Sequence, residues 1–596
     1  MSTPAIKSRS LADIISIRGR FQRSVHLERD YYDAQGNGYH ITPCAYAVLQ
    51  LVASAYEQQS ERAITLVGPY GAGKSALCVY TARLLNPRKP RNGAAHHLEL
   101  VDAELAAKLL QPSRALIPVL IVGSRQSLTK TLVKGLVSAL KRGGYIHLVE
   151  AITSEWAEVL ASQTPTSRQV ADLYKFAAEQ AGLEEASGLL VIVDEMGKLL
   201  EYAALHPDTE DIFVLQEIAE VAVRSGATPL IFMGVLHQNA DAYARKLGKT
   251  NQTEWAKVGE RFRTHQFSPS DSEQVDLIGY AIEQREPIVY PEAYEALVNQ
   301  CSEQLSLPVG LKERFADVAH AAYPLHPVTL IALPTLFRRT GQSHRSLFNF
   351  LAGHEPYALG AFLRESSFEE GDFPLLTVDR LFDYSAEVLV GGWSTSGISR
   401  LWVESIELIE RTHNISPEAM QLLKCIGLFG ILRDPKLPPT EEVLELALTD
   451  AHGQYPNVAE ALNELQQRAV IVKSRLRGTY RLWEGGDIDV AGALEAARIG
   501  LPAGTTLHVA SNLCPQASQI ARRHSYQTGT LRTVQMLPCA PEELERATEK
   551  SSGSLTVLYC LATTNEEAQM VEALARLQSD ANLLVAIGME TDIMRE

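Results

Sequence analysis

The stretch Ala63-Ile-Thr-Leu-Val-Gly68-Pro-Tyr-Gly71-Ala-Gly73-Lys74-Ser75 decides the fold of this chain. A run of apolar or β-branched residues leads into a glycine-rich turn, as a buried strand would, and good helix formers follow as Ala76–Leu85. The glycines let backbone N–H groups turn toward phosphates, and the N-terminus of the next helix adds positive potential. The spacing G-x-x-x-x-G-K-S between strand and helix therefore predicts a phosphate-binding loop; the alternative is a chance glycine turn.

We expect this loop to bind ATP with magnesium. Lys74 is expected to reach the β- and γ-phosphates, and the hydroxyl of Ser75 to ligate Mg²⁺. The backbone of the whole loop is expected to contact the nucleotide, through Gly68, Pro69, Tyr70, Gly71, Ala72, Gly73, Lys74 and Ser75.

A second motif, Gly188-Leu-Leu-Val-Ile-Val-Asp194-Glu195, is an apolar run that ends in two carboxylates. Asp194 at the end of this predicted strand is expected to hold Mg²⁺ through water. Glu195 is expected to polarise the attacking water as a general base. The alternative is a buried strand that ends in two solvated acids.

Two more apolar stretches fit the same sheet, Pro118–Ser124 between the two motifs and Pro229–Gln238 after them. Helical patterns alternate with these strands, which predicts a parallel sheet flanked by helices. A strand between the lysine motif and the acidic motif indicates the ASCE branch of P-loop proteins, which includes AAA+ ATPases. In that branch a polar residue after the next strand senses the γ-phosphate, and His237 or Gln238 fills that place; the alternative is a polar strand end in solvent.

Three arginines are further candidates. In AAA+ proteins an arginine before the fifth strand often reaches the nucleotide of a neighbouring subunit, where it neutralises transition-state charge. Arg261 is the first candidate for this role and Arg263 the second, the alternative being a surface ion pair. Arg345 begins a helix where a lid arginine can reach the phosphates; its alternative is an ordinary surface arginine on a packing helix.

The rest of the chain predicts further domains. Ser416–Phe429, Thr440–Leu448 and Val458–Arg468 predict three helices, and a two-stranded hairpin follows over 470–483, the layout of a winged helix. From Thr505 the pattern is α/β again, with a strand at 507–510 and a helix near 516–524; this part either completes itself or is the front of a longer protein. The expected divisions are an N-terminal helical extension (1–60), a P-loop ATPase core (61–268), a helical lid (269–371), a helical and winged-helix domain (372–490) and a C-terminal α/β domain (491–596).

The net charge, the apolar runs and the cysteine content limit the kinds of partner and the compartment that we expect. The 596 residues carry a net charge of −16, whereas a protein that grips bare DNA usually has a basic excess. No apolar run approaches the roughly 20 residues that span a bilayer. The seven scattered cysteines fit a reducing compartment, so we expect a cytoplasmic protein without a membrane partner.

The motifs together resemble those of large bacterial AAA+/STAND-like ATPases, a group that includes the ATPases of BREX-type phage-defence systems. The resemblance covers roughly residues 20–535, and the order Glu260-Arg261-Phe262 departs from the usual Gly-Arg-Phe. It rests on Gly68-Pro-Tyr-Gly-Ala-Gly-Lys-Ser, Val193-Asp-Glu, Leu236-His-Gln, Gly259-Glu-Arg-Phe, Tyr323-Pro-Leu-His-Pro, Arg345-Ser-Leu-Phe-Asn-Phe-Leu, Leu381-Phe-Asp-Tyr and Trp483-Glu-Gly-Gly-Asp.

The resemblance implies an oligomeric, nucleotide-driven switch or motor in anti-phage defence that controls a partner effector. Two alternatives remain at this point. One is an ATP-dependent loader or remodeller that contacts double-stranded DNA through the winged helix. The other is a slow-turnover oligomeric scaffold that organises a partner enzyme.

Overall fold

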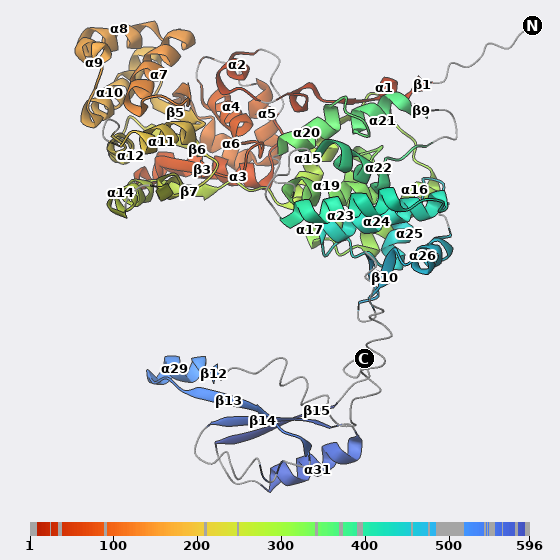
Figure 1. Cartoon of the computed structure of the whole chain (residues 1–596). Helices are drawn as coiled ribbons and strands as arrows, with labels where there is room; N and C mark the ends of the chain where they lie inside the picture. The colour runs from red at the N-terminus through yellow and green to blue at the C-terminus, as the bar shows by residue number, and fades with distance from the viewer. Residues whose placement is uncertain are drawn as a thin grey trace, which may run out of the picture. The chain divides into compact units, whose positions relative to one another are not determined.

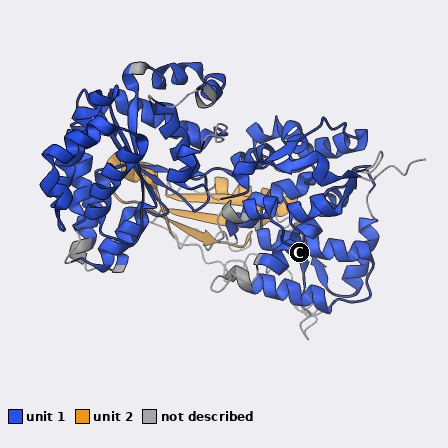
Figure 2. Ribbon diagram, turned by 90° about the horizontal axis from the view of Figure 1, so that it is seen from above, with its two compact units in different colours: residues 1–474, 478–483 blue, residues 475–477, 484–596 orange. Residues whose placement is uncertain are grey.

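The chain forms two compact units, each with its own core: residues 1–474 with 478–483, and residues 475–477 with 484–596 (Figure 2). The structure is a computed structural model. It describes residues 9–23, 25–33, 39–86, 88, 92–207, 211–246, 249–339, 344–368, 373–389, 397–454, 457–474, 477–483, 518–541, 544, 546, 555–562, 564–577 and 582–589.

A five-stranded parallel sheet organises the first unit and confirms the mixed α/β class (Figure 1). The strand that leads into the glycine-rich loop and the strand that ends in Asp194 are not neighbours, because β6 lies between them. Every residue of β3, β5 and β6 is buried, as expected of parallel strands covered on both faces. The order across the sheet is β4 (Leu116–Val122), β5 (Gly188–Asp194), β6 (Leu230–Leu236), β3 (Ala63–Val67) and β7 (Arg263–Gln266).

Helices cover both faces of this sheet, and alternate residues along a strand therefore belong to two different cores. Ile64 and Leu66 of β3 belong to one core, and Ala63 and Val67 to the other. On the first face lie α2 (Leu27–Tyr32), α3 (Pro43–Glu57), α4 (Lys74–Leu85) and α6 (Ala103–Leu109). On the second lie α7 (Leu128–Gly143), α8 (Ile146–Glu155), α10 (Ser167–Glu179), α11 (Met196–Leu205), α12 (Phe213–Val223) and α14 (Lys249–Glu260).

The helical region (residues 271–474 and 478–483) follows the sheet and has one continuous core. Buried residues on both sides of residue 371, such as Phe350 and Leu422, contribute to it, so the division expected there is not marked by a break in packing. Its principal helices are α15 (Asp271–Ala281), α16 (Glu292–Gln304), α18 (Phe315–Ala321), α19 (Pro327–Arg339), α20 (His344–Ala352), α21 (Leu359–Glu365), α22 (Val378–Tyr384) and α23 (Gly397–Arg411).

The three helices and the hairpin predicted at the end of this region are present. The helices are α24 (Pro417–Leu432), α25 (Glu441–Leu448) and α26 (Val458–Gln467). The antiparallel hairpin pairs β10 (Ile471–Lys473) with β11 (Tyr480–Leu482).

The N-terminal segment is shared between the two parts of the first unit. β1 (Arg9–Ser10) pairs with β9 (Ser367–Phe368), and β2 (Ile15–Ile17) pairs with β8 (Ile282–Gln284). Leu11 lies in the core of the helical region, whereas α2 and α3 pack on the sheet. The extension expected over residues 1–60 thus contributes to two cores.

The second unit holds a smaller sheet, in the order β12 (Gln519–Ile520), β13 (Thr533–Pro538), β14 (Thr556–Ala562) and β15 (Leu583–Met589). The last three strands are parallel, and α31 (Asn565–Arg576) shares their core through Val571. The helix predicted near 516–524 is wrong in position: Gln519 and Ile520 pair with β13 instead, and α29 (Arg522–Thr528) begins after them. The strand predicted at 507–510 lies outside the described residues.

Within the described parts of both units, no helix is both long enough and apolar enough to cross a bilayer.

Candidate functional site

The glycine-rich loop lies between the end of β3 and the start of α4. Gly68 has no room for a side chain, since a Cβ there would stand 2.0 Å from the carbonyl oxygen of Phe267. Gly71 and Gly73 have φ angles of 75° and 96°, which favour glycine. Gly73 is also the N-cap of α4 and supplies no side-chain hydrogen bond to the helix. The first N–H groups of α4 are therefore left without a side-chain cap, as an anion site requires.

Lys74 is buried at the first position of α4, and its ammonium group is held by the loop itself. Its Nζ donates hydrogen bonds of 2.6 Å to the carbonyl oxygens of Gly68 and Pro69. Burial lowers the pKa of Lys74 to about 8, against an opposing influence of Asp194. The loop thus contains a desolvated cation whose contacts are neutral carbonyls.

Asp194 and Ser75 are brought together, although they come from β5 and α4. Asp194 is 6% exposed, and burial raises its pKa above the ordinary value, despite hydrogen bonds from the Ser75 hydroxyl and the Glu195 N–H. The carbonyl of Asp194 accepts a 2.7 Å hydrogen bond from the N–H of Gly123. A hydroxyl beside a carboxylate fits Mg²⁺, which takes few protein oxygens and completes its shell with water and phosphate. No cluster of three or more potential metal-binding His, Cys, Asp or Glu side chains occurs among the described residues.

Glu195 follows Asp194 in a left-handed conformation, with φ 52° and ψ 33°, and acts as the N-cap of α11. Its carboxylate forms an ion pair with Lys198, one turn into the same helix. This hydrogen bond raises the pKa of Lys198. The sequence did not single out Lys198, although its i, i+3 spacing from Glu195 is the local signal that marks such a pair.

His237 follows β6 directly and lies at the same edge of the sheet as the loop. Val67 pairs with Leu236, so the carboxyl ends of β3 and β6 coincide, and the N–H of Gly68 donates to the Leu236 carbonyl at 3.2 Å. Burial, followed by the charge of Lys74, lowers the pKa of His237. Gln238 is exposed one residue further on.

Arg261 and Arg263 lie away from this chain's own loop. Arg263 pairs with Ile64, three residues before Val67, which places it about 10 Å of strand from the loop edge. It forms an ion pair with Glu61. Arg261 precedes β7, is exposed, and lines a surface hollow with Lys257. Neither arginine can serve the nucleotide site of its own chain from this position.

Arg345 falls in the first turn of α20, and its side chain lies outside the described part of the structure. Its predicted contact with phosphate stays a prediction.

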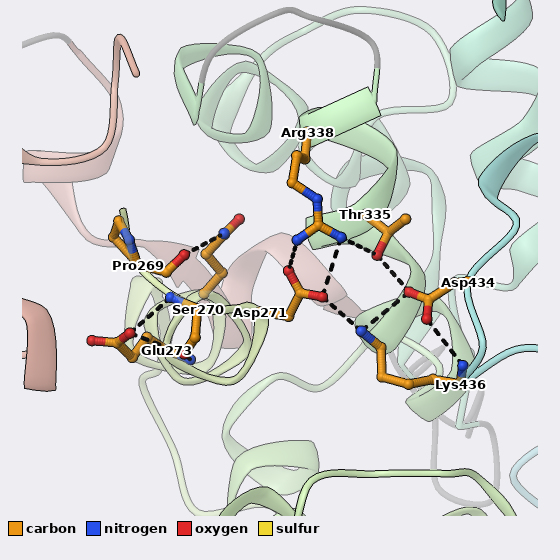
Figure 3. Close-up of polar contacts among 9 residues, drawn as sticks. Pro269, Ser270, Asp271, Glu273, Thr335, Arg338, Asp434 and Lys436 are labelled. Carbon is orange, nitrogen blue, oxygen red and sulfur yellow. Dashed lines mark hydrogen bonds and ion pairs between the residues drawn. The ribbon is translucent and has the colours of Figure 1, made fainter. Parts of the chain in front are cut away.

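The end of β7 connects the loop to the helical region through a polar junction (Figure 3). The N–H of Phe267 donates to the Val67 carbonyl at 2.6 Å, and α15 begins four residues later at Asp271. The carboxylate of Asp271 accepts a 2.6 Å hydrogen bond from Nζ of Lys436. It also accepts hydrogen bonds from both terminal guanidinium nitrogens of Arg338. Lys436 also lies 3.1 Å from Asp434. Three segments distant in sequence therefore meet at the first residue of α15.

The hairpin carries cations that already have partners within the chain. Lys473 lies 3.8 Å from Glu441 and over the ring of Tyr480. The guanidinium of Arg481 lies 5.5 Å from the ring centre of Trp483. Of the hairpin arginines, Arg475 lies outside the described residues, and Arg477 is exposed.

No protein-family model matches the chain, and a search of curated proteins finds no significant match. The functional argument therefore rests on the geometry of this site.

Proposed function

We propose that this chain binds ATP with magnesium at Gly68–Ser75 and hydrolyses it, as a P-loop ATPase of the AAA+/STAND-like type. The observation that carries the proposal is the start of α4, where an uncapped helix N-terminus, a desolvated lysine and a hydroxyl–carboxylate pair converge. Each lacks something that a magnesium triphosphate supplies: an anion for the N–H groups and Lys74, and a cation for Asp194. The position of β6 between β3 and β5 supports the same class.

In this proposal Lys74 leaves the carbonyls of Gly68 and Pro69 and turns to the β- and γ-phosphates. Ser75 and Asp194 would hold Mg²⁺, which would neutralise phosphate charge. Glu195 releases Lys198 and orients the attacking water as general base, and His237 contacts the γ-phosphate. Phosphate charge favours the protonated form of Lys74, so nucleotide binding reverses the pKa depression that burial imposes.

The Asp271 junction supports a nucleotide-driven switch. The loop touches Phe267, and the segment after Phe267 leads to a residue held by Arg338 and Lys436. A displacement of the loop by nucleotide therefore has a short path to the helical region, which we propose to contain a lid and a winged helix. Such a ligand shifts the equilibrium only by its differential affinity for the two states.

We further propose that the active form is a cytoplasmic homo-oligomer that controls a partner effector in anti-phage defence, as the motif resemblance implies. The position of Arg261 supports the oligomer, since this arginine is exposed and remote from its own loop. Double-stranded DNA is a second candidate partner, favoured by the exposed Arg477 and Arg481 on the hairpin.

ATP turnover of the wild type beside Lys74→Ala and Glu195→Gln tests the proposal. Lys74→Ala is expected to weaken ATP binding roughly 100-fold, because it removes a charge-assisted phosphate contact. Glu195→Gln is expected to retain binding and to lose roughly 100- to 10,000-fold in turnover, because the general base is removed. The exposed Lys175→Ala and Glu179→Gln on α10 are matched controls and should behave as wild type. Unchanged turnover in both Lys74→Ala and Glu195→Gln would overturn the assignment.

Light scattering with and without ATP, and with double-stranded DNA, tests the assembly. If Arg261 acts on a neighbouring copy, a mixture of Arg261→Ala and Glu195→Gln proteins regains part of the turnover that each lacks alone. A monomer with wild-type turnover would exclude this role for Arg261. Stimulation by DNA that Arg481→Ala abolishes would favour the loader over the switch.

A further inference from the structure

Tyr70 makes a specific contact from the loop to the end of β6. Its hydroxyl lies 2.5 Å from Nε2 of His237, and the two rings stack with centroids 3.7 Å apart and planes inclined by 25°. Tyr70 is nevertheless 52% exposed, so its ring contributes little to the core. A hydrogen bond and a ring contact between the same two side chains thus join the glycine-rich loop to the residue that follows β6.

The imidazole of His237 is also confined from the side of α11. A Cβ at Gly197 would stand 3.2 Å from Nε2 of His237 and 2.2 Å from the hydroxyl of Tyr243. Gly197 is the second residue after Glu195, so the helix that carries the general base packs closely on this ring. The loop, α11 and β6 therefore meet at one side chain.

The hydrogen bond has a consequence for the proton on the ring. A phenol hydroxyl that donates to Nε2 makes this nitrogen the acceptor, and the proton of a neutral imidazole then resides on Nδ1. His237 is half-buried, and its lowered pKa agrees with a neutral ring. With its hydroxyl as the donor, Tyr70 would fix both the plane of the ring and Nδ1 as the protonated nitrogen.

We propose that Tyr70 is a positioning residue for His237, through which the conformation of the loop controls turnover as well as nucleotide binding. The inference rests on the proposed ATPase function. A triphosphate that reshapes the loop moves Tyr70, and Tyr70 moves or releases the imidazole at the end of β6. The loop then influences hydrolysis in two ways: its backbone contacts the nucleotide, and Tyr70 orients His237.

Kinetics of Tyr70→Phe, Tyr70→Ala, His237→Ala and the double variant Tyr70→Ala/His237→Ala test this inference. Tyr70→Phe removes the hydrogen bond and keeps the stacking, so kcat is expected to fall about 5-fold with nucleotide Kd changed less than about 3-fold. Tyr70→Ala is expected to approach His237→Ala, and the double variant to be no slower than His237→Ala alone, because the two residues act as one unit. Tyr526→Phe, at a tyrosine that is 92% exposed, is the matched control.

The ¹⁵N chemical shifts of the His237 ring give a readout independent of turnover. The wild type is expected to show an unprotonated Nε2, and Tyr70→Phe a mixture of tautomers. Wild-type kcat in Tyr70→Phe and Tyr70→Ala, with an unchanged tautomer, would overturn the inference while leaving the ATPase proposal intact. Failure of the wild type itself to bind ATP would instead refute the proposed function. If Tyr70→Ala loses nucleotide binding, the Phe variant alone decides.

Discussion

Helices α4 and α15 both begin beside a partly or fully buried aspartate, but their first turns differ. At α15, Ser270 and Glu273 form a complete capping box, and Asp271 is paired with Arg338 and Lys436. Burial acts to raise the pKa of Asp271, but the hydrogen bonds from Lys436 and Arg338 outweigh it, so this pKa is lowered.

At α4 the corresponding cap, carboxylate and cation do not satisfy one another. Gly73 caps without a side chain, Asp194 has a raised pKa, and Lys74 contacts carbonyl oxygens while its own pKa is lowered. A helix start that the chain satisfies by itself stabilises the fold. A helix start whose charged groups are desolvated and lack a counter-charge destabilises the fold. The same groups can bind an anion together with its cation from solution.

Among the predicted changes in the free energy of unfolding, we expect the largest difference between the variants that neutralise Asp271 and Asp194. Asp271→Asn leaves Arg338 without its carboxylate and Lys436, which is 15% exposed, with Asp434 alone, and should cost about 3 kcal/mol in the free energy of unfolding. Asp194→Asn removes a desolvated charge and should change the free energy of unfolding by less than about 1 kcal/mol, or stabilise the protein. Urea unfolding at pH 7, followed by circular dichroism, measures both.

Asp172→Asn, at a half-buried residue of α10 that pairs with Arg168, is the control for loss of a peripheral carboxylate and is expected to cost under about 1 kcal/mol. Equal losses in Asp271→Asn and Asp194→Asn would mean that the two helix starts are equivalent, which contradicts the comparison.

The titration of Lys74 provides a somewhat smaller test. A folded-state pKa of about 8, below the ordinary 10.5, means that the folded chain binds fewer protons than the unfolded chain between these values. Stability therefore rises with pH in this window, and the wild type should gain about 2 kcal/mol relative to Lys74→Met between pH 8 and 10. The difference between the two unfolding curves isolates this lysine from other groups that titrate there. A difference that stays constant across the window would show that Lys74 is not desolvated.

Several features of the α4 start followed from the sequence, because they depend on local pattern and strand direction. The apolar run predicts β3, the glycine-rich turn predicts the loop, and the run of helix-forming residues predicts α4. Parallel strands end at one edge, so Asp194 and His237 were expected near the loop, and the register places them there. Their chemical roles stay predictions.

Other features depend on contacts that no local pattern reports. The strand β2 pairs with β8 across more than 260 residues, and Asp271 meets residues 338 and 436 only after the helical region has packed. No local pattern around Asp271 indicates these two partners. The contact of Tyr70 with His237 likewise depends on the shape of a loop and on the close approach of Gly197.

Substitution of the two serines at the helix starts gives the smallest expected effect on the free protein, and the two variants should differ in how much nucleotide stabilises them. Ser270→Ala removes an N-cap and should cost about 1 kcal/mol in the free energy of unfolding, with or without Mg²⁺ and ATP. Ser75→Ala should cost less than about half of that in the free protein, since it caps nothing and loses only its hydrogen bond to Asp194. At saturating ligand the wild type and Ser270→Ala should both gain about 2.7 kcal/mol at 100-fold excess over Kd, whereas Ser75→Ala should gain clearly less. Urea unfolding of the three proteins with and without Mg²⁺ and ATP measures this, and an equal ligand-induced gain in all three would show that Ser75 does not serve the bound nucleotide.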